Sequence, residues 1–405
     1  MMSLTDTNSP AIWPPMDLYK DVVVVPRINA STGTTQTCGP IWPDWENQIS
    51  ARYCRNGLPV DEKPELSGEI CVVDEPMVWA GIAHPHFGHF ISEHAPRILQ
   101  SVHHSTSEKF LYGFHHKSFP GLKAAPPHFL FTTEWFGLDP SRIVFCTENM
   151  HVKTLMVAPQ AEQLCRPSEE NTLGRLTDKY LDLLDQNTAR HKLQIVSNEI
   201  VFVSRSLLPF PKACSGGSSY LETVLRSLGV VIFHPERHSI RDQLAVYAGA
   251  KHLIFAEGSA VHGLQLLGRN NCSVSILTRR PGRKIAESNL KPRCRNLHYY
   301  GSARELLHFE GHFFSAKKLF PKPVFDLAGV FECFSNVGID LSKSWDENAY
   351  RAALVDDLRD WIKNIRHISL KRWNAVGDQS KLYASLTEIG LEDVSQFAKD
   401  HFLML

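Results

Sequence analysis

The sequence predicts an α/β fold in two domains, followed by helices at the C-terminal end. Short apolar runs typical of buried strands alternate with amphipathic stretches typical of helices, the pattern of a sheet covered by helices. The chain has 405 residues, which is long for a single core. Residues 346–368 and 378–405 have a helical pattern that is charged on one face, and we expect them to pack back as a cover.

Four segments follow from this pattern. They are an extended lead-in (1–68), a first α/β domain (69–185), a second α/β domain (186–310) and a helical cover (311–405). The lead-in is broken by prolines, and we expect one strand in it, Asp21–Val25, and little chemistry. An amphipathic helix predicted over Pro167–Asn187 marks the boundary between the two α/β domains.

In the first domain, the strands are expected at Ile70–Val73, Met77–Ala80, Lys109–Phe114, Ile143–Cys146 and Thr154–Val157. Between them, Pro127–Gly137 is helical in pattern and stops at a glycine. An Asp139-Pro140 turn follows.

In the second domain, the alternation is sharper. Strands are expected at Ile200–Val203, Val230–Phe233, His252–Phe255 and Ser273–Leu277, with helices over Tyr220–Leu228, Ser239–Ala250 and Ser259–Leu267. Helical crossovers between successive strands predict a parallel sheet. Ligands bind such sheets at the carboxyl ends of the strands.

Composition narrows the classes of function. Lys+Arg and Asp+Glu both number 43, which argues against a general nucleic-acid binder. The 9 cysteines are widely spaced and form no Cys-x-x-Cys pair, which favours free thiols in a reducing compartment. The N-terminus has no apolar run typical of a signal peptide, and no segment matches a membrane span. We therefore expect a soluble protein that is cytoplasmic if it comes from a bacterium.

Residues 84–100 carry the first candidate chemistry. His89 and Glu93 are four residues apart and lie on one face of a predicted apolar helix. A His–Glu pair can tune the acid–base character of both groups, although a structural pair is the alternative. Pro96 predicts either a kink or a restart of the helix, which leaves open whether Arg97 lies on the same face.

The strand ends of the second domain carry the other candidates. Arg205 follows the strand at Ile200–Val203 and is a candidate phosphate ligand, or else an ion pair closing the strand end. Glu257-Gly258-Ser259 opens a helix whose N–H groups can bind phosphate, and His262 lies further along it. The carboxylate of Glu257 suits a ribose or sugar hydroxyl better than a phosphate.

A basic loop follows. Residues 279–295 contain seven Lys and Arg residues and a single acidic residue, Glu287. The default interpretation is a solvated loop. The alternative is contact with an anionic acceptor or with a membrane surface.

Taken together, these motifs resemble glycosyltransferase family 61 over roughly residues 70–280. The motifs are His89, Glu93, Pro96 and Arg97; then Ser204-Arg205; then Pro235-Glu236 with Gln243; and then Gly258-Ser259. The chain departs from the family in three places, at His86 (usually Asn), Glu257 (usually His) and Ser259 (usually Ala). These departures leave the donor sugar undetermined.

The resemblance implies a GT-B-like fold, with two Rossmann-like domains facing a cleft, and inverting transfer from a nucleotide sugar without a bound metal. The first domain then serves the acceptor and the second the donor. A base, Glu93 or His89, deprotonates the acceptor hydroxyl, and Arg97 orients the site. The donor-binding residues implied are Arg205, Glu236, Glu257, Gly258, Ser259 and His262. The acceptor expected is a glycan or lipid-linked glycan, as in cell-envelope polysaccharide synthesis at the inner face of the membrane.

Two other classes stay open. One is a non-catalytic sugar-binding relative. The other is a metal-dependent hydrolase using His84, His86, His89 and His94, whose spacing does not match His-Glu-x-x-His.

Overall fold

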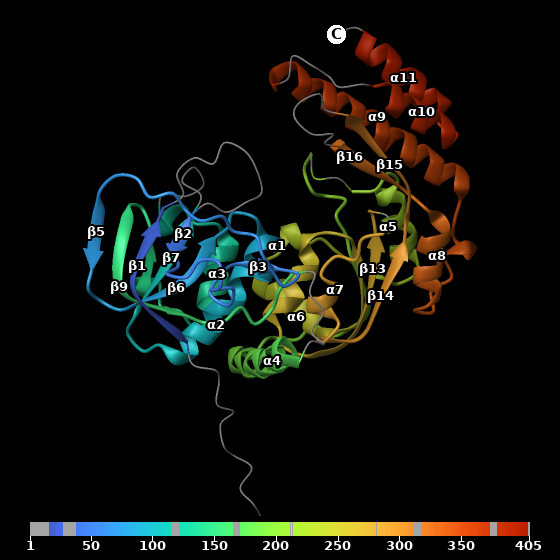
Figure 1. The fold of residues 1–405 in the computed structure, drawn as a ribbon. Helices are drawn as coiled ribbons and strands as arrows, with labels where there is room; N and C mark the ends of the chain where they lie inside the picture. Colours follow the sequence, from blue (N-terminus) through green and yellow to red (C-terminus); the bar gives the residue numbers. More distant parts are fainter. Residues whose placement is uncertain are drawn as a thin grey trace, which may run out of the picture. The chain divides into compact units, whose positions relative to one another are not determined.

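The computed structural model describes residues 16–26, 38–114, 121–164, 171–210, 212, 214–280, 282–310, 318–372 and 379–403. The fold is α/β, as the sequence predicts (Figure 1). The chain forms two compact units, each with its own sheet. The first unit is Met1–Gln194 with His262–Asn270 and Ala286–Arg293; the second is Ile195–Val261 with Asn271–Ile285 and Cys294–Leu405.

A seven-stranded sheet organises the first unit, in the order β2-β1-β9-β6-β7-β8 with β5 beside β9. Its strands are β1 (Asp17–Val25), β2 (Gly39–Ile41), β5 (Ile70–Val73), β6 (Met77–Ala83), β7 (Lys109–Phe114), β8 (Ile143–Phe145) and β9 (Asn149–Val157). β6, β7 and β8 are parallel, whereas β1 is antiparallel to β9. Every strand predicted for this half is present, and β1, β6 and β9 are longer than expected. A small hairpin, β3 (Cys54–Arg55) with β4 (Leu58–Pro59), lies in the lead-in.

β6 is buried along its whole length and contains an irregularity next to the candidate site. The register with β7 shifts between Trp79 and Gly81. Gly81 has a φ of +92°, and a Cβ there would lie 3.1 Å from Nδ1 of His94. Only glycine adopts this conformation readily and leaves that space. The bulge therefore lets the ring of His94 pack against the strand.

The helices of the first unit include α3 (Pro127–Trp135) and α4 (Asn171–His191). α3 matches the prediction, and short 3₁₀ turns lie on either side of it, η2 (Leu122–Ala124) and η3 (Pro140–Arg142). Asp139 caps η3 by accepting from the Ser141 N–H at 2.8 Å. α4 begins and ends four residues later than the helix predicted over Pro167–Asn187, whose first residues lie outside the described ranges.

The second unit contains a five-stranded sheet in the order β11-β10-β12-β13-β14. Its strands are β10 (Asn198–Val203), β11 (Val231–Phe233), β12 (Ala250–Ala256), β13 (Asn270–Thr278) and β14 (Cys294–Gly301). β11, β10, β12 and β13 pair in parallel, as predicted. The connecting helices are α5 (Ser218–Ser227) and α6 (Ile240–Gly249). Ser239 caps α6 by accepting from the Asp242 N–H at 3.1 Å.

Two parts of the second half differ from the prediction. The helix expected over Ser259–Leu267 is a 3₁₀ helix, η5 (Ser259–Leu266), and it begins in the second unit and ends in the first. The segment expected to be only helical contains β16 (Lys318–Phe325), paired with β15 (Ala303–Glu310). The two strands satisfy each other's backbone N–H and C=O groups. A pattern of hydrophobic residues within one segment does not reveal such a pairing with another segment.

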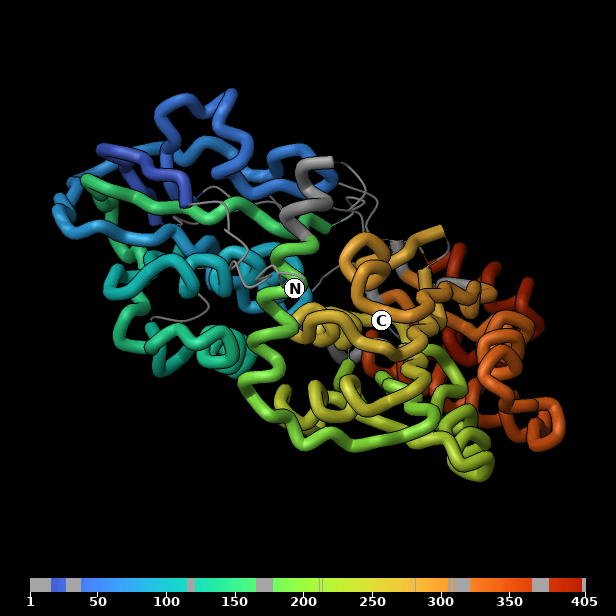
Figure 2. The backbone as a smooth tube through the Cα atoms, turned by 90° about the horizontal axis from the view of Figure 1, so that it is seen from below, coloured from blue at the N-terminus to red at the C-terminus, as the bar shows by residue number. Residues whose placement is uncertain are grey.

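The remaining helices are α7 (Glu287–Leu290), α8 (Leu327–Ser335), α9 (Glu347–Arg372), α10 (Ser380–Glu388) and α11 (Glu392–Leu403), with a 3₁₀ turn, η6 (Leu341–Lys343), between α8 and α9. α9, α10 and α11 lie side by side at the red end of the chain (Figure 2). Leu358 and Ile362 of α9 are fully buried in one core with Leu221 and Leu225 of α5. The C-terminal helices are thus part of the second unit's core.

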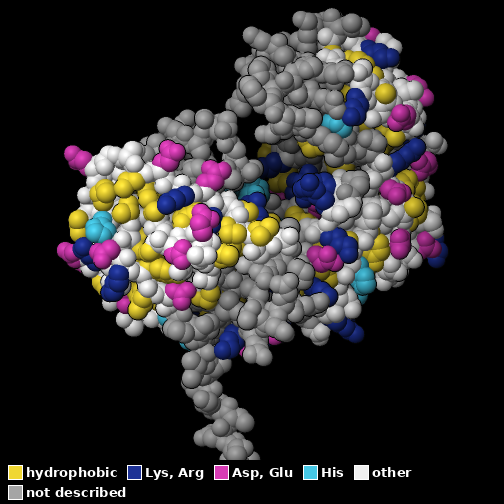
Figure 3. Space-filling model, in the orientation of Figure 1, with side chains coloured by type: hydrophobic (Ala, Val, Ile, Leu, Met, Phe, Trp, Pro, Cys, Tyr) yellow, Lys and Arg dark blue, Asp and Glu magenta, His cyan; other side chains and the backbone are white. Residues whose placement is uncertain are grey.

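The surface agrees with the neutral composition. Figure 3 shows acidic and basic side chains interspersed on the face it displays. Among the described residues, no helix is both long and apolar enough to cross a membrane. No disulfide joins the eight cysteines that the structure describes, and Cys165 lies outside those ranges.

Candidate functional site

The segment predicted as one helix is built in three parts. α1 (Phe87–His89) leads into a π-helical turn, η1 (Phe90–His94), and then into α2 (Ala95–His104). The N–H of Ala95 bonds to the carbonyl of Phe90, five residues back, and Pro96 occupies the first turn of α2. Proline has no N–H to continue the ladder, so the helix widens before it and restarts. The restart alternative was correct.

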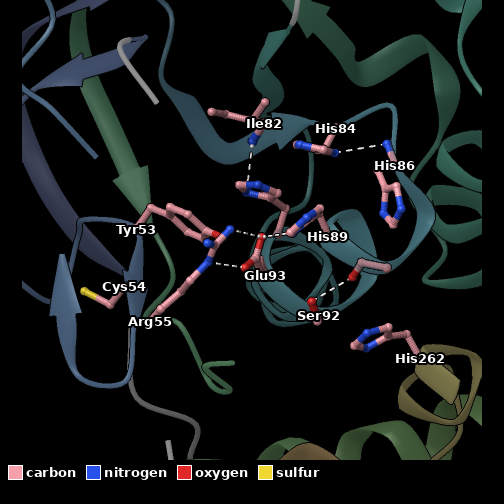
Figure 4. A network of polar contacts seen from close by, with 12 residues as sticks. Tyr53, Cys54, Arg55, Ile82, His84, His86, His89, Ser92, Glu93 and His262 are labelled. Atoms are coloured by element: carbon pink, nitrogen blue, oxygen red, sulfur yellow. Dashed lines mark hydrogen bonds and ion pairs between the residues drawn. The ribbon is translucent and has the colours of Figure 1, made fainter. Parts of the chain in front are cut away.

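Glu93 lies at the centre of a polar cluster on this wide turn (Figure 4). Its side chain is 1% exposed, whereas that of His89 is 40% exposed. One carboxylate oxygen accepts from Nε of Arg55. The other accepts from Nη2 of Arg55 at 3.1 Å and from Nδ1 of His89 at 2.9 Å. Both oxygens of Glu93 are therefore engaged by protein donors.

These contacts determine the charge of Glu93. Burial alone would raise its pKa, but the hydrogen bonds from His89 and Arg55 outweigh burial and lower the pKa to about 2. Glu93 is thus an anion at any physiological pH. Because a carboxylate only accepts hydrogen bonds, Nδ1 of a neutral His89 carries the proton and its Nε2 carries the lone pair.

Arg55 was not predicted, because it lies in the lead-in where we expected little chemistry. The structure pairs this arginine with Glu93. Tyr53 and Arg55 flank Glu93, and Nε of Arg55 also donates to the Tyr53 hydroxyl at 3.2 Å. Gln160 ties the β3 backbone at Cys54 to the carbonyl of Glu93. No local pattern around Arg55 signals this pairing, which joins residues 38 positions apart.

Arg97 does not contact His89 or Glu93. It is buried, and its guanidinium donates to three backbone carbonyls, those of Ser50 (3.3 Å), Ala51 (3.0 Å) and Arg52 (2.7 Å). This segment leads directly into Arg55. Arg97 therefore acts on the cluster through the backbone that positions Arg55, rather than by facing the site itself.

Two other histidines of the motif, His84 and His94, are uncharged at neutral pH. Burial lowers the pKa of His84 to about 4 and that of His94 to about 3. Nδ1 of His94 accepts from the Ile82 N–H at 3.4 Å, and its ring stacks on Tyr53. In the part of the chain that the structure describes, no three His, Cys, Asp or Glu side chains converge as metal ligands. His84 and His94 each make a hydrogen bond to a backbone N–H, those of His86 and Ile82.

His262, predicted as a donor ligand, belongs to this same unit. It is buried, and its Nδ1 lies 2.7 Å from Oε1 of Gln265. Burial lowers the pKa of His262 to about 4, and Glu93, His89 and His86 lie close enough to influence it. Figure 4 shows its ring pointing toward the helical segment that carries Ser92 and His89.

The second unit holds a separate cluster at the carboxyl ends of β10, β12 and β13. A small pocket there is lined by side chains of Ser204, Arg205, Ser215, Ser218 and Arg279, among others. Burial and the neighbouring Arg279 lower the pKa of Arg205 to about 10. Nε of Arg279 is buried and has no hydrogen-bond partner among the described residues. Two guanidinium groups thus face one pocket.

The guanidinium of Arg205 packs directly against the backbone of Gly258. A Cβ at this position would lie 1.9 Å from Nη1 of Arg205. Behind the strand end, the carboxylate of Glu222 accepts from the hydroxyls of Ser204 and Ser206. The loop that carries Arg205 is therefore fixed from one side by Glu222 and packed against glycine on the other.

Glu257 is not available for a sugar hydroxyl. Its carboxylate accepts from the N–H groups of Arg279 (2.7 Å) and Arg280 (3.2 Å) and from the Arg280 guanidinium. The side chain of Glu257 is 0% exposed. Its role here is to hold the turn after β13.

The remaining predicted donor residues are placed as follows. Glu236 is exposed on a 3₁₀ turn, η4 (Pro235–Arg237), which Gln243 holds by donating to the Pro235 carbonyl at 2.8 Å. Ser259 is partly buried at the start of η5.

The basic segment 279–295 is not one solvated loop. Arg280 is paired with Glu257, and Arg293 is fully buried in an ion pair with Glu162. Arg283, Lys284, Lys291 and Arg295 are exposed.

The fold is α/β and holds these two polar clusters, and comparison with known proteins adds a family match. The sequence model of the family described as Glycosyltransferase 61 matches residues 87–274. The matched residues make up a little under half of the chain, and over them the resemblance drawn from its motifs is confirmed. The match supports glycosyltransferase activity in general. No curated protein matches the chain.

Proposed function

We propose that the protein is an inverting glycosyltransferase that moves a sugar from a nucleotide-sugar donor to a hydroxyl of a glycan. The observation that carries the proposal is the Arg55–Glu93–His89 arrangement. A carboxylate held by arginine bonds Nδ1 of a partly exposed imidazole, which leaves Nε2 as the nitrogen that carries the lone pair. The proposed base is His89, and Glu93 orients it.

The choice between the two candidate bases rests on access. Both oxygens of Glu93 are occupied and its side chain is buried, so an acceptor hydroxyl has no route to it. Nε2 of His89 takes the proton of the acceptor hydroxyl as that oxygen forms its bond to C1 of the sugar. The bond from C1 to the diphosphate oxygen breaks, and its electron pair leaves with the diphosphate. Glu93 stabilises the imidazolium that forms.

Arg205 and Arg279 are suited to the departing diphosphate. Burial and Arg279 lower the pKa of Arg205, and burial and Arg280 lower the pKa of Arg279. Two such guanidinium groups favour an anion between them, and guanidinium binds phosphate bidentately. The backbone at Gly258 and Ser259 adds N–H groups at the start of η5. We propose that this positive charge serves in place of a metal ion.

The acceptor side of the proposal also changes. Arg279 and Arg280 were candidates for an anionic acceptor or a membrane surface, but their contacts lie with the pocket and with Glu257. The exposed residues Arg283 and Lys284 are the ones we assign to a glycan or lipid-linked acceptor. A cytoplasmic location at the inner face of a membrane fits this assignment.

The first experiment is calorimetric binding of UDP, GDP, CMP and ADP to the full chain, with and without EDTA. We expect one nucleotide to bind in EDTA. Arg205→Ala and Arg279→Ala should each weaken it by at least about 10-fold, because each removes a charged hydrogen bond worth about 1.5–3 kcal/mol. The control is Arg283→Ala, an exposed arginine four residues beyond Arg279, which should bind normally.

Two outcomes would overturn the proposal. Failure of every nucleotide to bind would favour a non-catalytic sugar-binding relative. Binding that disappears in EDTA would contradict the metal-free mechanism.

A further inference from the structure

A chain of four buried polar side chains ends at His262, and neither the family match nor the motifs assign three of its members. Arg293 pairs with Glu162, with Nη2 at 3.0 Å from Oε2. Nε2 of Gln265 donates to Oε2 of Glu162 at 3.3 Å. Oε1 of Gln265 lies 2.7 Å from Nδ1 of His262. All four residues are at most 5% exposed.

The direction of each hydrogen bond follows from the groups involved. Arg293 only donates, so Glu162 is held as a carboxylate that only accepts. The amide nitrogen of Gln265 must therefore face Glu162, which leaves its oxygen facing His262. An amide oxygen also only accepts, so the proton of His262 must be on Nδ1. The orientation of one buried ion pair thus fixes the tautomer of an imidazole two residues away in the chain of contacts.

The consequence is a free lone pair on Nε2 of His262. This atom has no hydrogen-bond partner among the described residues. Polar groups of buried side chains are ordinarily hydrogen-bonded. Three buried side chains nevertheless maintain the free lone pair on Nε2, close to His89 and Glu93.

We infer that Arg293, Glu162 and Gln265 form a relay that positions His262, so that its Nε2 accepts a hydrogen bond from a hydroxyl of the sugar substrates. The inference rests on the proposed function of the His89 cluster. A lone pair repels phosphate oxygens, so His262 serves a sugar hydroxyl and not the diphosphate. Because burial keeps the ring neutral above its low pKa, the acceptor is present throughout the physiological range.

Histidine ring ¹⁵N NMR tests the relay directly, without reference to activity. In the full chain, with the His262 signals assigned by comparison with His262→Gln, Nδ1 should be protonated and Nε2 unprotonated at pH 7.5. Gln265→Met, which keeps the volume and removes the amide, should move the ring toward the Nε2–H tautomer that free imidazole prefers. It should also lower kcat and leave nucleotide affinity unchanged.

A matched control is Gln100→Met, because Gln100 is equally buried in the same unit and bonds only to the carbonyls of Pro96 and Pro159. It should reduce stability without altering the His262 signals. A wild-type ring protonated on Nε2, or a ring unchanged by Gln265→Met, would overturn the relay even if the enzyme is active. If the relay holds and no nucleotide binds, the proposed function fails instead.

Discussion

At the scale of single residues, the sequence identifies the proposed acid–base pair but not the residues that hold it in place. His89 and Glu93 were recognisable because their spacing stacks them on one helix face. Arg55, Gln160 and Glu162 were not, because each reaches its partner across at least 38 positions with no local pattern to mark it. Arg97 was expected to orient the site. Its buried guanidinium instead donates to backbone carbonyls more than 40 positions away, and no sequence motif marks such acceptors.

Substituting His89 and Glu93 one at a time tests the role proposed for each. His89→Ala should lower kcat by ~10²–10⁴-fold at unchanged nucleotide affinity, since it removes the base. Glu93→Gln should lower it comparably, because the amide leaves both the tautomer of His89 and the charge of Arg55 unsupported. Steady-state kinetics with His103→Ala as control, an exposed histidine on α2, checks this. Near-normal turnover in His89→Ala would remove it from the role of base.

At the scale of elements, the alternating half of the chain was the most predictable. Each parallel strand from β10 to β13 was predicted within two or three residues, because fully buried strands are continuous apolar runs between helical stretches. The π-turn and the 3₁₀ character of η5 were not, since both depend on packing rather than on periodicity. The pairing of β15 with β16 was missed because the contact is not local.

The turn from β12 into η5 gives a prediction of its own. Gly258→Ala places a methyl group on the guanidinium of Arg205, the movable end of a flexible side chain, so the protein should fold and Arg205 should be displaced. Nucleotide affinity should fall by about 10-fold or more through the loss of a charged hydrogen bond. Gly301→Ala, with nothing within 4 Å of its Cβ, is the calorimetric control. Equal affinity in both variants would show that Arg205 does not bind the donor.

At the scale of the whole molecule, the sequence predicted two α/β parts, but not that the first would be assembled from three stretches of chain. The separate pieces His262–Asn270 and Ala286–Arg293 join it through contacts such as Trp135 with the Leu266 carbonyl, at 2.9 Å. Composition and periodicity do not show that later stretches of the chain pack into the first unit. Three histidines whose pKa is lowered to about 4 or below, His84, His94 and His262, lie in this unit.

These histidines make the first unit sensitive to acid. Their pKa is lower in the folded state than the ordinary 6.5, so the unfolded chain binds more protons and stability falls as pH drops from 6.5 to about 4. Each contributes on the order of 1.4 kcal/mol per pH unit at most. Glu93, with its pKa lowered, begins to add to the loss only below 4.5.

Scanning calorimetry between pH 7.5 and 4.5 should show one transition moving to lower temperature more than the other, since each unit has its own core. His94→Gln, which retains an acceptor for the Ile82 N–H, should reduce that shift. The control is His401→Gln in the second unit, on α11, which should not. Two transitions that shift equally would contradict the assignment of the sensitivity to the first unit.

The buried pair of Glu162 with Arg293 has a consequence for how the protein is made. The sheet of the first unit is complete by residue 157. The ion pair of Glu162, however, requires Arg293, which lies 131 positions later in the chain. A chain growing from the ribosome at about 5–20 residues per second therefore carries Glu162 unpaired for several seconds. Until the arginine emerges, the nascent unit holds an uncompensated carboxylate in its interior, and its folding cannot finish in the N-to-C order of synthesis.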